Sequence, residues 1–305
     1  MASLGRSPWS GTPAGTAPSP LRFPGITVDH IVEWELPFED IRTFLPTLTA
    51  ELLAENRHWL HPWALDDDDK LIIALQSYVV RTPHHTILID TCIGNDKPRP
   101  GRPLMDKRTD PGWLNALAAI GLSVENIDIV MCTHLHVDHV GWNTRLENGR
   151  WVPTFPNARY LFSAKEFDYW AAENTADPIP HFADSVLPVV EANLHQFVRS
   201  DFVLDDHVRL LPTPGHTPDH YAVILGKGRD EAVMAGDLIH SPLEARYPDL
   251  VMRADVDQAL ACQTRRAFLE SYCDTNTVCC TAHFPSPSRV RIKRWDAGFR
   301  CDPVD

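Results

Sequence analysis

The sequence has no apolar run near the roughly 20 residues that a membrane-spanning helix needs, and its first 20 residues contain no apolar core of a secretory signal. Basic residues are also few, because 28 Lys and Arg stand against 41 Asp and Glu and give a formal net charge of −13. A surface of that sign repels phosphate backbones and anionic lipids. We therefore expect a small-molecule substrate as partner, and neither a nucleic acid nor a membrane.

Cysteine pairs with redox or metal-site spacing are absent as well. The seven cysteines are scattered, odd in number and without a CxxC pair, so we expect reduced thiols in a cytoplasmic protein. Residues 1–25 are rich in Gly, Pro, Ser and Thr and predict a disordered leader. No linker-like segment divides residues 26–305, which predicts a single domain there.

Hydrophobic periodicity predicts strands that first form hairpins and later alternate with helices. This order indicates an α+β fold with helices covering the sheets. The expected strands are 26–36, 71–80, 86–90, 127–132, 160–163, 208–211, 221–225, 231–235 and 277–281. The expected helices are 38–59, interrupted or restarted near Pro46, and 114–120, 164–173, 185–193 and 257–272.

The most informative segment is the run His-Leu-His-Val-Asp-His at residues 134–139, directly after the apolar strand 127–132. In an extended segment, side chains two residues apart point to the same face, so His134 and His136 can hold one metal ion. The chain must then turn, and Asp138 and His139 face a second ion. A lone histidine is usually a core or surface residue, but this density after a strand favours a metal site.

Three further metal-binding side chains follow predicted strands. His216 lies in a Pro-Gly-His-Thr turn, Asp237 follows Gly236, and His283 follows the last predicted strand. One ion needs about three protein ligands and an open position, so a larger set is natural for two ions that share a carboxylate. The seven candidate metal ligands are His134, His136, Asp138, His139, His216, Asp237 and His283.

Other polar residues are expected to support this site or to stand outside it. Asp90 follows a strand and is predicted to support the cluster from behind, and His220 is predicted to be a buried hydrogen-bonding residue because Pro218 argues against a helical zinc pair. The remaining histidines have no partner at ligand spacing and are not expected to bind metal. They are His30, His58, His61, His84, His85, His181, His195 and His207.

The order and spacing of these motifs between residues 26 and 292 resemble those of the metallo-β-lactamase-fold hydrolases. The resemblance implies a four-layer αβ/βα sandwich with the metals at one edge, and two divalent ions, with zinc expected and iron, manganese or cobalt as alternatives. It implies one ion on His134, His136 and His216, a second on Asp138, His139 and His283, and Asp237 bridging them. It also implies a possible homodimer.

Within that superfamily, the segments 133–143, 236–242 and 282–285 are similar to the branch of lactonases and methyl-parathion-hydrolase-like organophosphatases. We expect a metal-bridging hydroxide to cleave a lactone, ester or phosphotriester. The predicted catalytic residues are Asp237, Asp138 and His240, and the predicted substrate contacts are His240, Trp142 and Phe284. His240 occupies the position at which homoserine-lactone hydrolases commonly have a tyrosine. This difference favours the organophosphatase-like subgroup.

Alternative functions stay open at this point. An iron-binding redox or dioxygenase-type protein on the same fold, a glyoxalase-II-like thioesterase and a non-catalytic metal-stabilised binding module would use the same ligands. The aromatic residues Trp34, Phe38, Trp59 and Trp63 either wall the pocket or belong to the core.

Overall fold

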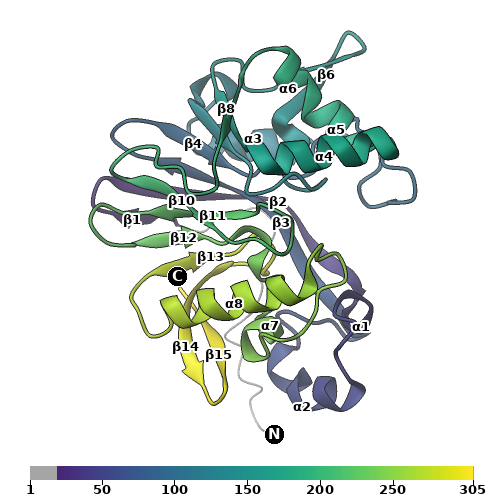
Figure 1. Cartoon of the computed structure of the whole chain (residues 1–305), viewed down its shortest axis with the longest axis vertical. Helices are drawn as coiled ribbons and strands as arrows, with labels where there is room; N and C mark the ends of the chain where they lie inside the picture. The colour runs from purple at the N-terminus through teal and green to yellow at the C-terminus, as the bar shows by residue number, and fades with distance from the viewer. Residues whose placement is uncertain (1–18, 305) are drawn as a thin grey trace, which may run out of the picture.

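The computed structural model describes residues 19–304, which form two facing β-sheets with helices on their outer surfaces (Figure 1). Within these residues, one sheet has seven strands in the order β1-β2-β3-β4-β5-β8-β9, and the other has six in the order β10 to β15. The strands β6 and β7 form a separate hairpin. The bounds of the strands are Leu21–Phe23 (β1), Ile26–Asp40 (β2), Lys70–Arg81 (β3), Thr86–Ile89 (β4), Ile129–Met131 (β5), Thr144–Glu147 (β6), Arg150–Pro153 (β7), Arg159–Ser163 (β8), His195–Val198 (β9), Val208–Pro212 (β10), Tyr221–Leu225 (β11), Ala232–Met234 (β12), Val278–Cys280 (β13), Arg289–Trp295 (β14) and Gly298–Pro303 (β15).

Short polar side chains begin the longer helices. The Thr49 hydroxyl accepts the N–H of Leu52 at the start of α2, and Ser163 and Asp257 cap α4 and α8 in the same way, which satisfies N–H groups that the first turn leaves without a partner. The bounds of the helices are Ile41–Phe44 (α1), Ala50–Leu60 (α2), Gly112–Ala119 (α3), Ala164–Ala176 (α4), Pro180–Ser185 (α5), Leu187–Glu191 (α6), Pro242–Arg246 (α7) and Gln258–Tyr272 (α8).

Three hydrophobic clusters separate the four layers. One cluster lies between the two sheets and joins residues of β2, β3 and β4 to residues of β10, β11 and β12. A second packs the seven-stranded sheet against α3, α5 and α6. The third packs the six-stranded sheet against α8 and also includes α1, α2 and the loops beside them. The helices α3 to α6 therefore cover one outer face and α7 and α8 the other, as Figure 1 shows. The predicted αβ/βα sandwich in a single domain is confirmed.

Some element boundaries differ from the prediction for local reasons. The helix expected over 38–59 restarts after Pro46, as predicted, and forms α1 and α2. Its start differs, because Phe38 extends β2. The helix expected over 185–193 is the pair α5 and α6, each with a proline in its first turn. The hairpin β14–β15 was not predicted, although it completes the six-stranded sheet.

The predicted leader needs a correction at its end. Residues 1–18 lie outside the described residues, so the prediction of disorder there stays a prediction. Residues 21–23 instead form β1, which pairs antiparallel with the start of β2. Leu21 is buried in the cluster between the sheets, and its apolar contacts explain why this segment joins the fold.

Two other expectations concern the whole chain. Among residues 19–304, none of the helices is both long enough and apolar enough to span a bilayer. The seven cysteines all have free thiols, as their spacing predicts.

Candidate active site

The histidine run is held in place by the loop that follows β4. The N–H of Thr91 donates to the carbonyl of His139, and the N–H groups of Gly141 and Trp142 donate to the carbonyls of Cys92 and Thr91. A Cβ on Gly141 would lie 1.9 Å from the backbone of Ile93, so only glycine permits this approach. The two loops therefore fix each other at the carboxyl ends of adjacent parallel strands, β4 and β5.

Three imidazole nitrogens converge on one point. His136 Nδ1 lies 2.9 Å from His134 Nε2 and 3.0 Å from His216 Nε2. His134 and His136 come from the run after β5, whereas His216 follows β10 in the other sheet. The three nitrogens are close enough to bind a single ion.

A second group of ligand atoms lies beside the first. Asp138, His139 and His283 present atoms within 4.8 Å of one another. His139 Nε2 is 3.9 Å from Asp138 Oδ1, and His283 Nε2 is 3.8 Å from Asp138 Oδ2. This group likewise takes its members from both sheets, because His283 follows β13.

Asp237 lies between the two groups and presents one carboxylate oxygen to each. Its Oδ2 atom is 3.3 Å from His216 Nε2 and 3.6 Å from His134 Nε2. Its Oδ1 atom is 2.9 Å from His283 Nε2 and 3.1 Å from His139 Nε2. One carboxylate in this position is able to bridge two ions.

The donor set fits divalent metal ions. Asp237 Oδ1 and His139 Nε2 are buried and make no hydrogen bond within residues 19–304, although they face each other. Burial lowers the pKa of His134 and His136 well below the usual range, so their rings are neutral. Burial opposes ionisation of Asp237, but the imidazoles of His139 and His283 outweigh it and hold the pKa of this carboxyl well below its usual range. Neutral imidazoles and an ionised carboxylate are the forms that bind metal.

Neighbouring polar groups orient the rings. His139 Nδ1 lies 3.0 Å from Asp90 Oδ2, and His216 Nδ1 lies 2.8 Å from Asp255 Oδ1. His283 Nδ1 lies 3.0 Å from the carbonyl oxygen of Ala74 in β3. Such contacts fix which ring nitrogen faces the centre. Asp90 is therefore placed as predicted, behind the cluster, whereas Asp255 was not anticipated.

The turn that carries Asp237 depends on His220. His220 Nε2 accepts the N–H of Asp237 at 3.0 Å, and its Nδ1 is 2.8 Å from Thr213 Oγ1. Gly236 has φ +53°, and a Cβ there would lie 2.5 Å from His220 Nε2. The structure thus places His220 as the hydrogen-bonding residue that the sequence predicts.

His240 lies beside the same carboxylate and is held by a buried ionic network. His240 Nε2 is 3.3 Å from Asp237 Oδ2, and Nδ1 is 3.6 Å from Glu244 Oε1. Burial alone would lower the pKa of His240, but Glu244 and Asp237 raise it to about 10. Arg265 of α8 connects the network, with Nη2 3.0 Å from Glu244 Oε1 and 3.7 Å from Asp255 Oδ2.

The two groups open into a cavity of about 710 Å³. His136, Asp138, His216, Asp237, His240 and His283 line its floor, and the walls are mostly apolar. The wall residues include Trp34, Phe38, Phe44, Ile73, Leu75, Leu104, Met105, Trp170, Ile179 and Met252. A cavity of this size and polarity suits a small organic molecule.

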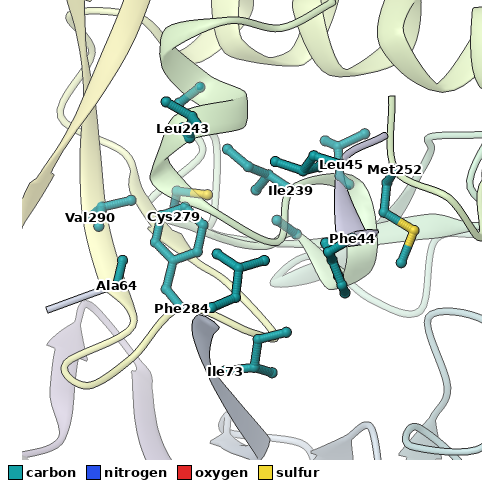
Figure 2. Packing of buried hydrophobic residues seen from close by; sticks show 14 of the residues in the cluster. Phe44, Leu45, Ala64, Ile73, Ile239, Leu243, Met252, Cys279, Phe284 and Val290 are labelled. Atoms are coloured by element: carbon teal, nitrogen blue, oxygen red, sulfur yellow. The ribbon is translucent and has the colours of Figure 1, made fainter. Parts of the chain in front are cut away.

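Two predicted substrate contacts are not in this cavity. Trp142 stacks on Trp113 with ring centroids 5.4 Å apart and donates its indole N–H to Glu33. Phe284 is fully buried among core residues such as Ile73 and Val290 (Figure 2). Both are therefore core residues, and the prediction that they contact substrate is corrected.

The four aromatic residues of the N-terminal region divide between wall and core. Trp34 and Phe38 line the cavity. Trp59 instead packs on Trp295, and Trp63 packs on Phe284.

Sequence reasoning missed two polar atoms in the cavity wall. Trp34 Nε1 and His181 Nε2 are buried and make no hydrogen bond within the described residues. Burial lowers the pKa of His181 to about 4, so the ring is neutral. Trp34 is one of the aromatic residues expected in the wall or the core, but no local sequence pattern marks its N–H group or His181, because β2 and α5 bring them to the cavity from separate parts of the chain.

Comparison with known proteins agrees with this geometry. A sequence profile of the metallo-β-lactamase superfamily matches residues 75–275. The chain belongs to the metallo-β-lactamase superfamily. That match spans the candidate metal ligands except His283.

Two relatives of the chain are described as a lactonase and a probable metallo-hydrolase. The chain is 24% identical to an N-acyl homoserine lactonase from a Bacillus species over 171 residues, covering 53% of this chain and 62% of the relative. It is 28% identical to a probable metallo-hydrolase from Methanocaldococcus jannaschii over 152 residues, covering 50% of this chain and 56% of the relative. The match thus spans less than two thirds of each of these relatives.

Solved structures show the same fold. The chain superposes on the dizinc quorum-quenching lactonase AidC, in complex with a homoserine product, with a TM-score of 0.76 and 24% identity. It superposes on the β-lactamase-superfamily hydrolase AbOPH with a TM-score of 0.79 and 18% identity. Both alignments cover 94% of this chain and 97% of the other.

Proposed function

We propose that this superfamily member is a two-metal hydrolase that cleaves a lactone, ester or phosphotriester. The observation that carries the proposal is the position of Asp237, whose two oxygens face separate groups of ligands. In the proposed assignment, one ion is held by His134, His136 and His216, the other by Asp138, His139 and His283, and Asp237 bridges them. Zinc is the proposed metal, because imidazole and carboxylate ligands suit it and the structural neighbour AidC is a dizinc enzyme.

Two bound ions would polarise the scissile carbonyl or phosphoryl oxygen and lower the pKa of a water molecule between them toward about 7. The residues of the chain supply the remaining functions. Asp237, an ionised carboxylate with an oxygen toward each group, orients the attacking water. Asp138, a proposed ligand, also lines the cavity.

His240 is the proposed proton donor to the leaving oxygen. It lines the cavity, and Nε2 lies beside Asp237. Glu244 accepts the backbone N–H groups of His240 and Ser241 at 2.7 and 2.8 Å, which fixes the position of the ring. A positioned imidazole within reach of the reacting group is a common general acid.

The apolar wall favours substrates with an alkyl or aryl group. Phe44 packs edge-on against His240 with ring centroids 5.4 Å apart, so a hydrophobic substituent bound there lies next to the proton donor. Phe44 and Met252, both labelled in Figure 2, belong to the hydrophobic cluster and also line the cavity.

A substrate panel on protein of measured zinc content tests the proposal. We expect hydrolysis of at least one of γ-nonalactone, phenyl acetate and diethyl 4-nitrophenyl phosphate, loss of that activity after chelation, and recovery on addition of Zn²⁺. Protein with two zinc ions per chain that hydrolyses none of the three would contradict the proposal. Activity that survives complete chelation would contradict it as well.

A further inference from the structure

A second cluster of potential metal ligands lies away from the active site. His84 Nε2 is 3.5 Å from Asp206 Oδ1, and His207 Nδ1 is 2.7 Å from the same oxygen. The three ligand atoms lie within 4.8 Å of one another, and the two imidazole rings are 5.6 Å apart. His84 and Asp206 are about half exposed, whereas the side chain of His207 is only 8% exposed.

His207 has a buried nitrogen without a hydrogen-bond partner. Its Nδ1 atom makes no hydrogen bond among residues 19–304, although Asp206 Oδ1 is close to it. The two atoms are close enough for an ion pair, which a metal ion bound by the ring and the carboxylate would replace.

Ordered backbone segments carry these side chains. The Thr82 hydroxyl accepts the N–H groups of His84 and His85 at 3.1 and 3.0 Å and fixes the turn between β3 and β4. Asp205 Oδ1 accepts the N–H of His207 at 2.8 Å. The ring of His207 also packs beside Gly25, where an added Cβ would lie 3.3 Å from Nε2.

The cluster and the active site occupy opposite ends of the same strands. His84 precedes β4, and Asp90 follows it. His207 precedes β10, and His216 follows it. Because each residue of a strand advances about 3.3 Å, these two strands separate the cluster from the active site by roughly 15 Å.

We propose that His84, Asp206 and His207 form a third metal site, which binds a divalent transition-metal ion and joins the two sheets at this end. Two imidazoles and one carboxylate favour zinc or copper over calcium and magnesium, which prefer oxygen ligands. Three protein ligands leave a position for water. Sequence spacing could not reveal the site, since His84 and His207 are far apart in the chain.

Lys227 tunes the affinity in this proposal. Its Nζ atom is 2.6 Å from Asp206 Oδ2, so it leaves Oδ1 free for the ion but places a positive charge nearby. This charge weakens binding of a cation. Replacing Lys227 with methionine should therefore tighten the third site.

The test counts zinc bound to the full chain. Protein is first loaded with zinc, then passed over a desalting column and titrated with Zn²⁺ by calorimetry, with metal counted by mass spectrometry. We expect one further binding event per chain in the wild type. His84→Ala should weaken it more than about tenfold, Lys227→Met should strengthen it, and His85→Ala, on the same turn but outside the cluster, should leave it unchanged.

His84→Ala is the informative variant because His84 is half exposed and its loss leaves the core intact. His207→Ala provides a second test, with circular dichroism to confirm that it folds. A wild type without a further event would overturn the proposal, as would an event that persists unchanged in His84→Ala. The result does not depend on the proposed hydrolase activity, because binding at this site is measured without a substrate.

Discussion

Glu33 and Glu244 support the site from the two halves of the molecule, and their carboxyl groups have opposite pKa shifts. Loss of hydration raises the pKa of Glu33 to about 7, although the N–H of Ile93 and the indole of Trp142 donate to it. Burial would raise the pKa of Glu244 too, but Arg265 and His240 outweigh it and lower the value to about 2. The difference is a cation: Arg265 contacts Glu244, whereas Glu33 makes no ion pair among residues 19–304.

This difference follows from how each half delivers its ligands. The seven-stranded half contributes one continuous loop, which is shaped by hydrogen bonds along the backbone and by the carboxylates of Glu33 and Asp90. The six-stranded half contributes His216, Asp237 and His283 from three separate strand ends. There Arg265 reaches from α8 to the carboxylates behind His216 and His240. In this half a buried arginine therefore connects the residues behind separate ligands, whereas the ligands of the other half already belong to one loop.

Asp237 lies between the two groups of ligands, so Asp237→Asn should have the largest effect on activity. An amide has one neutral oxygen and cannot bridge two ions as a carboxylate does. We expect kcat/KM on a substrate from the panel to fall more than about 100-fold, beyond the usual cost of losing an outer partner of a metal ligand, and zinc content to fall below two per chain. Asp230→Asn, in the same half but away from the site, is the control. Wild-type turnover by Asp237→Asn would remove the basis of the proposed function.

The same comparison explains what the sequence revealed. The spacing of residues 134–139 is enough to predict that they bind metal. The ligands His216, Asp237 and His283 are predicted because each follows an expected strand. Asp255 and Arg265 could not be found, since their roles arise only when α8 packs against loops that are distant in the chain.

The failures have a physical reason as well. Trp142 and Phe284 lie next to predicted ligands in sequence, but adjacent side chains in a turn can point to opposite sides, and here they enter the core. The sequence does not distinguish Trp34 from Trp59 and Trp63, and only the course of β2 brings Trp34 to the cavity wall. Proximity in sequence to a ligand is therefore weak evidence for contact with substrate.

Glu33→Gln should change how stability depends on pH. The folded state holds the Glu33 proton more tightly than the unfolded chain, so the native protein binds more protons between about pH 4.5 and 7. The free energy of unfolding that this group contributes is therefore greatest at low pH and is lost as pH rises through that window. We expect the difference between wild type and Glu33→Gln to change by up to about 3 kcal/mol across it, measured by chemical denaturation. For the exposed control Glu55→Gln, the free energy of unfolding should depend on pH as it does in the wild type. If Glu33→Gln also has the pH dependence of the wild type, the prediction is refuted.

Asp90→Asn and Asp255→Asn compare the supports of the two halves directly. Asp90 contacts His139, and Asp255 contacts His216. Each change should weaken zinc binding about 10- to 100-fold, measured by competition with a chromophoric chelator. Because Asp255 also faces Arg265, its variant should lose more thermal stability than Asp90→Asn. If both variants lose the same thermal stability, the ionic network around Arg265 does not stabilise the six-stranded half more than Asp90 stabilises the other half.

Trp34→Phe should have the smallest effect, which we expect on KM. It tests whether the seven-stranded half of the molecule also contacts the substrate. The Trp34 indole N–H lines the cavity without a partner in the described structure, and it can only donate. A substrate with a hydrogen-bond acceptor beside its scissile group should use it, at a gain of about 0.5–1.5 kcal/mol. We expect KM for an N-acyl lactone to rise roughly 3- to 10-fold, with little change for an alkyl lactone of the same length. Trp59→Phe, whose indole donates to Asn56 away from the cavity, controls for the loss of an indole. A parallel rise in KM for both lactones would assign Trp34 to packing alone, and substrate recognition would then depend on His240 in the six-stranded half.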